Sequence, residues 1–156
     1  MWHALGAALV LGALVASVPA ATTAPAPDVG EELYLRGIVA SGQPIEASRQ
    51  AGSRMQGAAA ACVNCHQRSG LGGREGRTLV PPITGRYLFR PRAGANDDRG
   101  IPFVEGMRPD REPYTDESLA RAIREGIDSA GRSLGYLMPR YAMGDGDMAA
   151  LAGYLR

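Results

Sequence analysis

The chain has 156 residues, which is enough for one domain. Its 17 basic residues nearly balance 16 acidic ones, so the formal net charge is only +1. This balance excludes the strongly basic character of a typical nucleic-acid-binding protein, and we expect no nucleic-acid partner.

The first residues resemble an export signal rather than part of the domain. Residues 4–18 are uncharged and rich in Ala, Leu and Val, a run that is short for a membrane span and typical of a secretory signal core. We predict a signal peptide over 1–20 and a Pro- and Ala-rich linker over 21–27. No Arg or Lys precedes the apolar run, so an uncleaved N-terminal anchor is the alternative. Either way, we expect the domain over 28–156 to be exported to the periplasm or an equivalent compartment. The sequence does not decide between a soluble domain and one tethered to the membrane by its N-terminal segment.

The first helix of the exported part is expected directly after Asp28, a good N-cap residue. Glu31 and Glu32 lie in its first turn, where the helix dipole favours acidic side chains. Gly37 or Gly42 is expected to end it.

Two further helices are expected in the last third of the chain. One begins at Thr115 as its N-cap and ends near Gly126, with apolar residues every four positions between them. The last begins at Asp145 or Asp147 and has one apolar face, made of Met148, Leu151, Ala152 and Leu155.

Between these helices the sequence predicts short helical turns and loops. Single turns are expected over 58–66 and 86–91, a loop or a marginal helix over 42–57, and loops or irregular segments over 70–82, 92–113 and 134–146. Because no run alternates between polar and apolar residues over the length of a strand, we expect an all-α domain of three to four helices with long loops. Aliphatic side chains are few for so much loop, so a further group is expected to fill the centre.

Both cysteines of the chain and one of its two histidines lie within ACVNCHQRSG, which starts at residue 61. C-x-x-C-H is the attachment pattern of a c-type haem. On a helical turn Cys62 and Cys65 share a face, so both thiols can form thioethers with one porphyrin while His66 binds the iron. The other ring N–H of His66 should donate to a backbone carbonyl. We therefore expect one covalent haem c.

Other uses of these residues are weaker. A structural zinc site needs four ligands, and Cys62, Cys65 and His66 are three. A thioredoxin-like C-x-x-C follows a strand of a βαβ unit, and no strand is expected here. A disulfide across two residues closes a loop too small to stabilise the fold much.

The second axial ligand of the iron decides the function, and methionine is the ligand that suits electron transfer. Met138 is the preferred candidate, because it lies in the irregular segment before the last helix and is followed by the stiff Pro139. Met143 and Met107 are open alternatives, whereas Met148 is expected in the core.

The arginines are unevenly distributed along the chain. Between residues 62 and 95 there are six arginines and one acidic residue, namely Arg68, Arg74, Arg77, Arg86, Arg90, Arg92 and Glu75. Such a stretch is typical of a solvated loop, and it is also suited to steering an acidic redox partner.

With CVNCH, four other stretches resemble the class I single-haem cytochrome c family: GEELYLRG, VPPITG, LMPRY and DMAALAGYLR. The resemblance covers residues 28–156. It implies that Met138 is the axial sulfur opposite His66, and that the carbonyl of Pro81 accepts the hydrogen bond from His66.

The resemblance also implies that the first and last helices cross at close range, where Gly30 and Tyr34 meet Tyr154. Two features depart from the family pattern. The stretch before Cys62 is longer than usual, and the loop over 92–113 is extra; both bear on the partner surface.

The function that this reading predicts is electron transfer by a haem with His/Met ligation, as a one-electron shuttle between redox partner proteins outside the cytoplasm. No enzymatic activity is expected. The alternative is a haem enzyme or gas sensor with an open or displaceable distal ligand. It is disfavoured because residues 21–156 contain no histidine besides His66.

Overall fold

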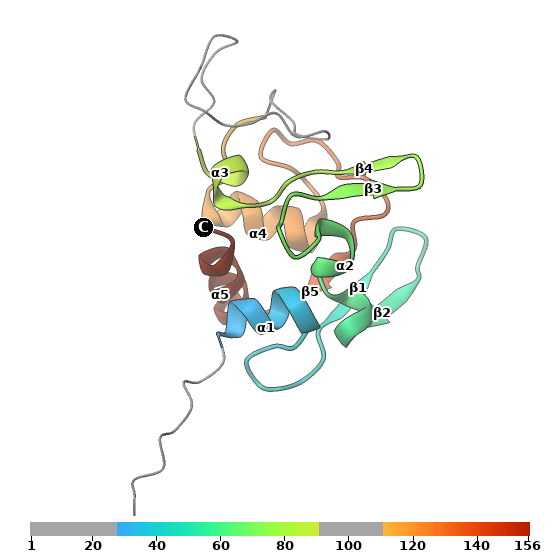
Figure 1. Cartoon of the computed structure of the whole chain (residues 1–156), viewed down its shortest axis with the longest axis vertical. Helices are drawn as coiled ribbons and strands as arrows, with labels where there is room; N and C mark the ends of the chain where they lie inside the picture. The colour runs from blue at the N-terminus through green and yellow to red at the C-terminus, as the bar shows by residue number, and fades with distance from the viewer. Residues whose placement is uncertain (1–27, 91–110) are drawn as a thin grey trace, which may run out of the picture.

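The computed structural model describes residues 28–90 and 111–156 (Figure 1). The predicted signal and linker, and most of the loop predicted over 92–113, lie outside these ranges. Among the described residues, no helix has the length and apolar character needed to cross a bilayer.

The first predicted helix is confirmed as α1, Val29–Arg36. The carboxylate of Asp28 accepts a hydrogen bond from the backbone N–H of Glu31 at 3.0 Å, so it caps the helix as predicted. The helix ends at Gly37, whose φ of 68° is a left-handed conformation that glycine adopts easily.

The two C-terminal helices are also present, as α4, Asp116–Glu125, and α5, Asp145–Leu155. Thr115 caps α4 through a capping box with Ser118, and Gly126 ends it. The predicted cap of α5 at Asp145 or Asp147 is wrong, because Gly144 is the N-cap. The carboxylate of Asp147 instead accepts a hydrogen bond from the backbone N–H of Ala40 at 2.8 Å, so it ties α5 to the segment after α1.

Short helical turns lie where the sequence predicts them. The region 58–66 overlaps the 3-10 turn η1, Gly57–Ala60, and contains the single turn α2, Val63–His66. The region 86–91 overlaps α3, Gly85–Leu88.

The expectation of an all-α fold of three to four helices is wrong, because the described residues form five α-helices and two small antiparallel sheets. The strands β1, Glu46–Ser48, β2, Arg54–Gln56, and β5, Arg140–Ala142, form one sheet in the order β2-β1-β5. The strands β3, Gly73–Glu75, and β4, Thr78–Val80, form a hairpin.

These strands escape prediction because each has only three residues, too few for an alternating pattern. Their pairing also depends on contacts between distant parts of the chain. In the sheet, Glu46 of β1 is paired with Ala142 of β5, and Ala47 with Tyr141.

The helices α1 and α5 pack against each other at close range (Figure 1). A methyl group on Gly30 would clash with the backbone oxygen of Ala150 and would come within 2.6 Å of Tyr154 Cβ. The rings of Tyr34 and Tyr154 lie beside this crossing, 5.4 Å apart. This is the helix contact that the resemblance implies, and buried residues of both helices continue it into the core.

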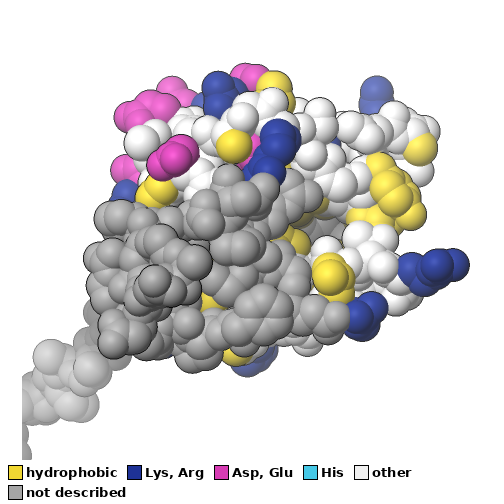
Figure 2. Space-filling view, turned by 90° about the horizontal axis from the view of Figure 1, so that it is seen from above, with side chains coloured by type: hydrophobic (Ala, Val, Ile, Leu, Met, Phe, Trp, Pro, Cys, Tyr) yellow, Lys and Arg dark blue, Asp and Glu magenta, His cyan; other side chains and the backbone are white. Residues whose placement is uncertain are grey.

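Both signs of charge are present on the face seen from above. In this view (Figure 2), acidic side chains gather toward the upper left with arginines beside them, and further arginines lie on the other side of the face together with hydrophobic side chains.

Gly30→Ala tests the close crossing of α1 and α5. The added methyl group collides with backbone atoms that cannot turn away, so we expect the free energy of unfolding to fall by about 1–3 kcal/mol. Urea denaturation followed by circular dichroism measures this change.

Gly153→Ala is the matched control, because no heavy atom lies within 4 Å of a Cβ at Gly153. Alanine favours the helix, so this variant should be as stable as the parent or up to ~1 kcal/mol more stable. Equal stability of the two variants would contradict the close crossing.

Candidate functional site

Cys62, Cys65 and His66 lie on one helical turn, α2 and its N-cap residue. The backbone N–H of His66 donates to the carbonyl of Cys62 at 2.9 Å, which closes the turn. Both cysteines are half-buried and neither forms a disulfide. The turn therefore presents two thiols and one imidazole from a single short segment.

His66 is buried, with 5% of its surface exposed. Its Nδ1 lies 3.0 Å from the carbonyl oxygen of Pro81, the hydrogen bond that the resemblance implies. A carbonyl can only accept, so Nδ1 carries the hydrogen and the lone pair of the imidazole lies on Nε2. Burial lowers the pKa of His66 to about 4, although the bond to Pro81 acts in the opposite direction. The imidazole is thus neutral near pH 7, the form that binds a metal.

The segment after His66 is held from two sides. The hydroxyl of Tyr34, which lies in α1 and is 1% exposed, donates to the carbonyl of Gln67 at 2.6 Å. The backbone N–H of Gly72 donates to the carbonyl of His66 at 3.0 Å. These bonds restrain the backbone that carries the imidazole.

The thiols have the character of buried neutral groups. Burial raises the pKa of Cys62 to about 11 and also raises the pKa of Cys65. Beside Cys62 lies Tyr141 of β5, whose hydroxyl donates to the carbonyl of Ala60 at 2.8 Å. Because the thiolate is the reactive form of cysteine, these raised pKa values disfavour a thiol–disulfide catalyst.

A zinc site is also disfavoured by the geometry. Within residues 28–90 and 111–156, no group of three or more His, Cys, Asp or Glu side chains is arranged to hold a metal ion. A structural zinc site requires four such ligands.

The sequence did not reveal that Arg49 lies near this turn, because it belongs to a segment expected to be a loop or a marginal helix. The inward-facing residues of β1 and its flanks are Ile45, Ala47 and Arg49, since burial alternates along this segment. Arg49 Nε is buried and has no hydrogen-bond partner among the described residues. Its charge acts on Cys65, lowering the pKa against the larger effect of burial. An arginine thus takes the third inward position, beside the cysteines.

The methionine candidates differ in their surroundings. Met138 is half-buried and packs against the same core as Cys62. Met143 belongs to that core, with 9% of its surface exposed, and Met148 is a core residue as predicted. Met107 lies outside the described residues. The assignment of Met138 as axial ligand stays a prediction.

Arg140 holds the segment that contains Met138, a role that the sequence did not reveal. Its guanidinium donates to the carbonyl of Met138 and, at 3.4 Å, to that of Leu134. It lies directly over Gly126, where a Cβ would overlap it and where φ is +75°. A glycine at the end of α4 therefore makes room for the arginine that shapes the Met138 segment.

In comparisons with known proteins, no family model, curated protein or solved structure matches this chain. The resemblance to cytochromes c therefore depends on the sequence stretches quoted above.

Arg140→Gln tests whether this guanidinium holds the Met138 segment. Losing bonds to two carbonyls should reduce the free energy of unfolding by about 1–3 kcal/mol. Hydrogen exchange of the Met138 amide, which bonds to the carbonyl of Gly135 at 3.1 Å, should become faster.

The control for this variant is Arg36→Gln. Arg36 forms only an exposed ion pair with Glu32 in the described structure, and such pairs contribute about 0–1 kcal/mol. If the Met138 amide exchanged at the same rate in both variants, Arg140 would not hold the segment.

Proposed function

We propose that this protein is an electron-transfer protein with one covalent c-type haem, attached to Cys62 and Cys65 and ligated by His66 and Met138. The observation that carries the proposal is the geometry of one turn. Two free thiols, three residues apart, precede the buried and neutral imidazole of His66. The Nδ1–H of this imidazole donates to the carbonyl of Pro81. These residues fit the thioether and axial-ligand chemistry of a c-type haem.

The chain's own residues prepare this ligand set. The hydrogen bond to Pro81 fixes the tautomer and orientation of His66, so that Nε2 is the ligand atom. Tyr34 and Gly72 donate to the carbonyls of Gln67 and His66 and so restrain the backbone at and directly after the imidazole. When bound, haem supplies a one-electron change at its iron.

Electron transfer is favoured over open-site haem chemistry by the Met138 segment. Arg140 bonds to the carbonyl of Met138 and so restrains the residue proposed as distal ligand. A sulfur ligand that stays in place closes the site and raises the potential. The proposed role is therefore a one-electron shuttle between redox partner proteins outside the cytoplasm, not an enzyme.

Removal of the thiols tests the attachment. We expect the Cys62→Ala/Cys65→Ala variant to carry no covalent haem, because no thioether can form, and His66→Ala to give no stable holoprotein. Peroxidase staining of the denatured chain on a gel, after export in a host that attaches c-type haem, measures covalent haem.

Asn64→Ala is the control, since Asn64 lies between the cysteines and its amide bonds only to the carbonyls of Ala58 and Ala59 in the described structure. It should retain the haem. Covalent haem in the double cysteine variant at the parent level would refute the proposal.

Met138→Ala tests the distal ligand. Haem should stay attached, the reduction potential should fall, and the reduced protein should bind carbon monoxide, because the sixth position opens. Potentiometric titration and visible spectra measure these changes.

Met143→Ala is the comparison, since Met143 is a buried core residue and should affect stability instead. If Met143→Ala opened the iron and Met138→Ala did not, the ligand assignment would be wrong. Tight carbon monoxide binding by the parent protein would favour a sensor or enzyme.

Arg49→Gln tests the half-buried arginine near Cys65. A nearby positive charge disfavours the oxidised iron, so its removal should lower the reduction potential by about 30–60 mV. Potentiometry at constant ionic strength measures the shift.

Arg54→Gln is the control. Arg54 lies in β2, the strand paired with β1, but its side chain is exposed, so screening by solvent should leave the reduction potential nearly unchanged in this variant. Equal shifts in the two variants would show that only the net charge matters, and not the position of Arg49.

A further inference from the structure

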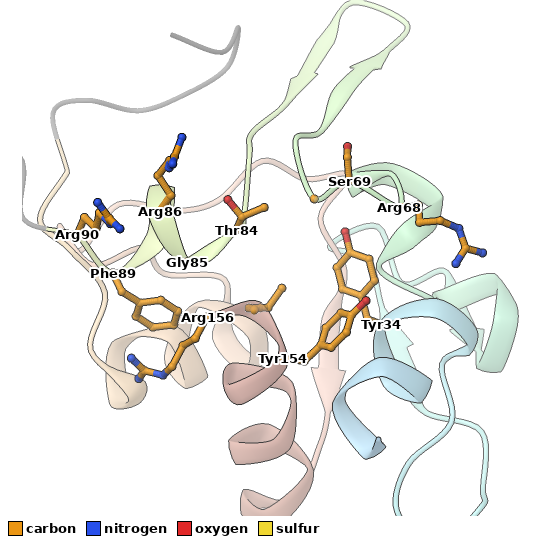
Figure 3. A pocket seen from close by; sticks show the side chains of 12 residues that line it. Tyr34, Arg68, Ser69, Thr84, Gly85, Arg86, Phe89, Arg90, Tyr154 and Arg156 are labelled. Carbon is orange, nitrogen blue, oxygen red and sulfur yellow. The ribbon is translucent and has the colours of Figure 1, made fainter. Parts of the chain in front are cut away.

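Beside the segment that follows His66, the described residues form a pocket of about 600 Å³, whose lining includes none of the residues proposed to hold haem (Figure 3). We call it the arginine pocket. It lies among α1, α3, the end of α5 and the segment after His66. Its lining includes four arginines and three aromatic residues but no acidic residue, namely Arg68, Arg86, Arg90, Arg156, Tyr34, Phe89 and Tyr154.

The fold gathers part of the basic stretch around this pocket. In Figure 3, Arg68 stands on one side, near Tyr34, while Arg86 and Arg90 stand on the opposite side with α3. Tyr154 lies between the two sides. Arg68 and Arg86, which are 18 residues apart in sequence, thus line one pocket.

The arginines of the pocket differ in how far they are neutralised. Arg156 forms an ion pair with Asp116, and its guanidinium lies 4.1 Å from the centre of the Phe89 ring. Arg68, Arg86 and Arg90 are exposed and form no ion pair within the described part of the chain. Their charge is therefore available to a ligand.

We propose that the arginine pocket binds a small organic polyanion that carries two or more carboxylate or phosphate groups. The volume lies within the range of small-molecule sites, and the planar guanidinium matches both kinds of anion. Three lining arginines without an ion pair in the described part of the chain favour a ligand with more than one anionic group over a monoanion. The hydroxyls of Ser69, Thr84 and Tyr154 line the same pocket and offer neutral hydrogen-bond donors.

The pocket lies directly behind the segment that carries His66. Tyr34 lines the pocket, and its hydroxyl donates to the carbonyl of Gln67 at 2.6 Å. Arg68, which also lines the pocket, directly follows Gln67 in the chain. If the proposed function holds, an anion here stabilises the oxidised iron and lowers the reduction potential. By linkage, the oxidised protein binds the anion more tightly than the reduced protein.

The binding test uses the full chain as exported, titrated by calorimetry with citrate and with pyrophosphate at constant ionic strength. We expect saturable binding at one site per chain for at least one of them, and no saturable binding of acetate. Citrate alone would assign a carboxylate ligand and pyrophosphate alone a phosphate ligand. Absence of saturable binding by both would overturn the proposal.

A pair of double variants locates the site. Arg68→Gln/Arg86→Gln should weaken binding at least tenfold. Arg54→Gln/Arg77→Gln removes the same charge at exposed positions outside the pocket, and should weaken binding less than twofold. Equal losses in the two variants would show diffuse electrostatic attraction and would overturn the proposal.

The coupling is tested on the same samples. Haem content is measured first, so failure of the proposed function is seen separately from failure of anion binding. In haem-containing protein, saturation with the bound anion should lower the reduction potential of the parent but not of Arg68→Gln/Arg86→Gln. An unchanged potential in the parent, despite binding, would overturn the coupling.

Discussion

The hydrogen bond between His66 Nδ1 and the carbonyl of Pro81 is the constraint on which the proposed site depends. It joins the C-x-x-C-H turn to the segment after β4, 15 residues later. Because a carbonyl accepts only, the bond fixes which imidazole nitrogen keeps its lone pair. Burial then keeps the ring neutral. Together, the bond and the burial leave His66 as a neutral imidazole whose Nε2 can bind a metal.

The scaffold supports this bond from elements that are distant in sequence. The crossing of α1 and α5 at Gly30 places Tyr34 where its hydroxyl reaches the segment after His66. From the other side, β5 pairs with β1 and brings Tyr141 beside Cys62. The same strand supplies Arg140, which restrains the Met138 segment. Both sides of the proposed site thus depend on long-range packing.

The helices could be predicted from the sequence because their signals are local, as with Asp28 and Thr115 at the N-caps and Gly126 at the end of α4. The sheets could not, since a strand of three residues has no period and its partner is far away. The roles of Arg49 and Arg140 were missed for a related reason. No local pattern shows which backbone group or thiol a long side chain will reach after the chain has folded.

Intact mass and visible absorbance of the exported parent chain, measured after full unfolding, test the covalent attachment of haem. We expect the haem mass and colour to remain with the polypeptide. We also expect Cys62 and Cys65 not to react with a thiol reagent, because both sulfurs are in thioethers. A colourless chain of unmodified mass with two reactive thiols would contradict it.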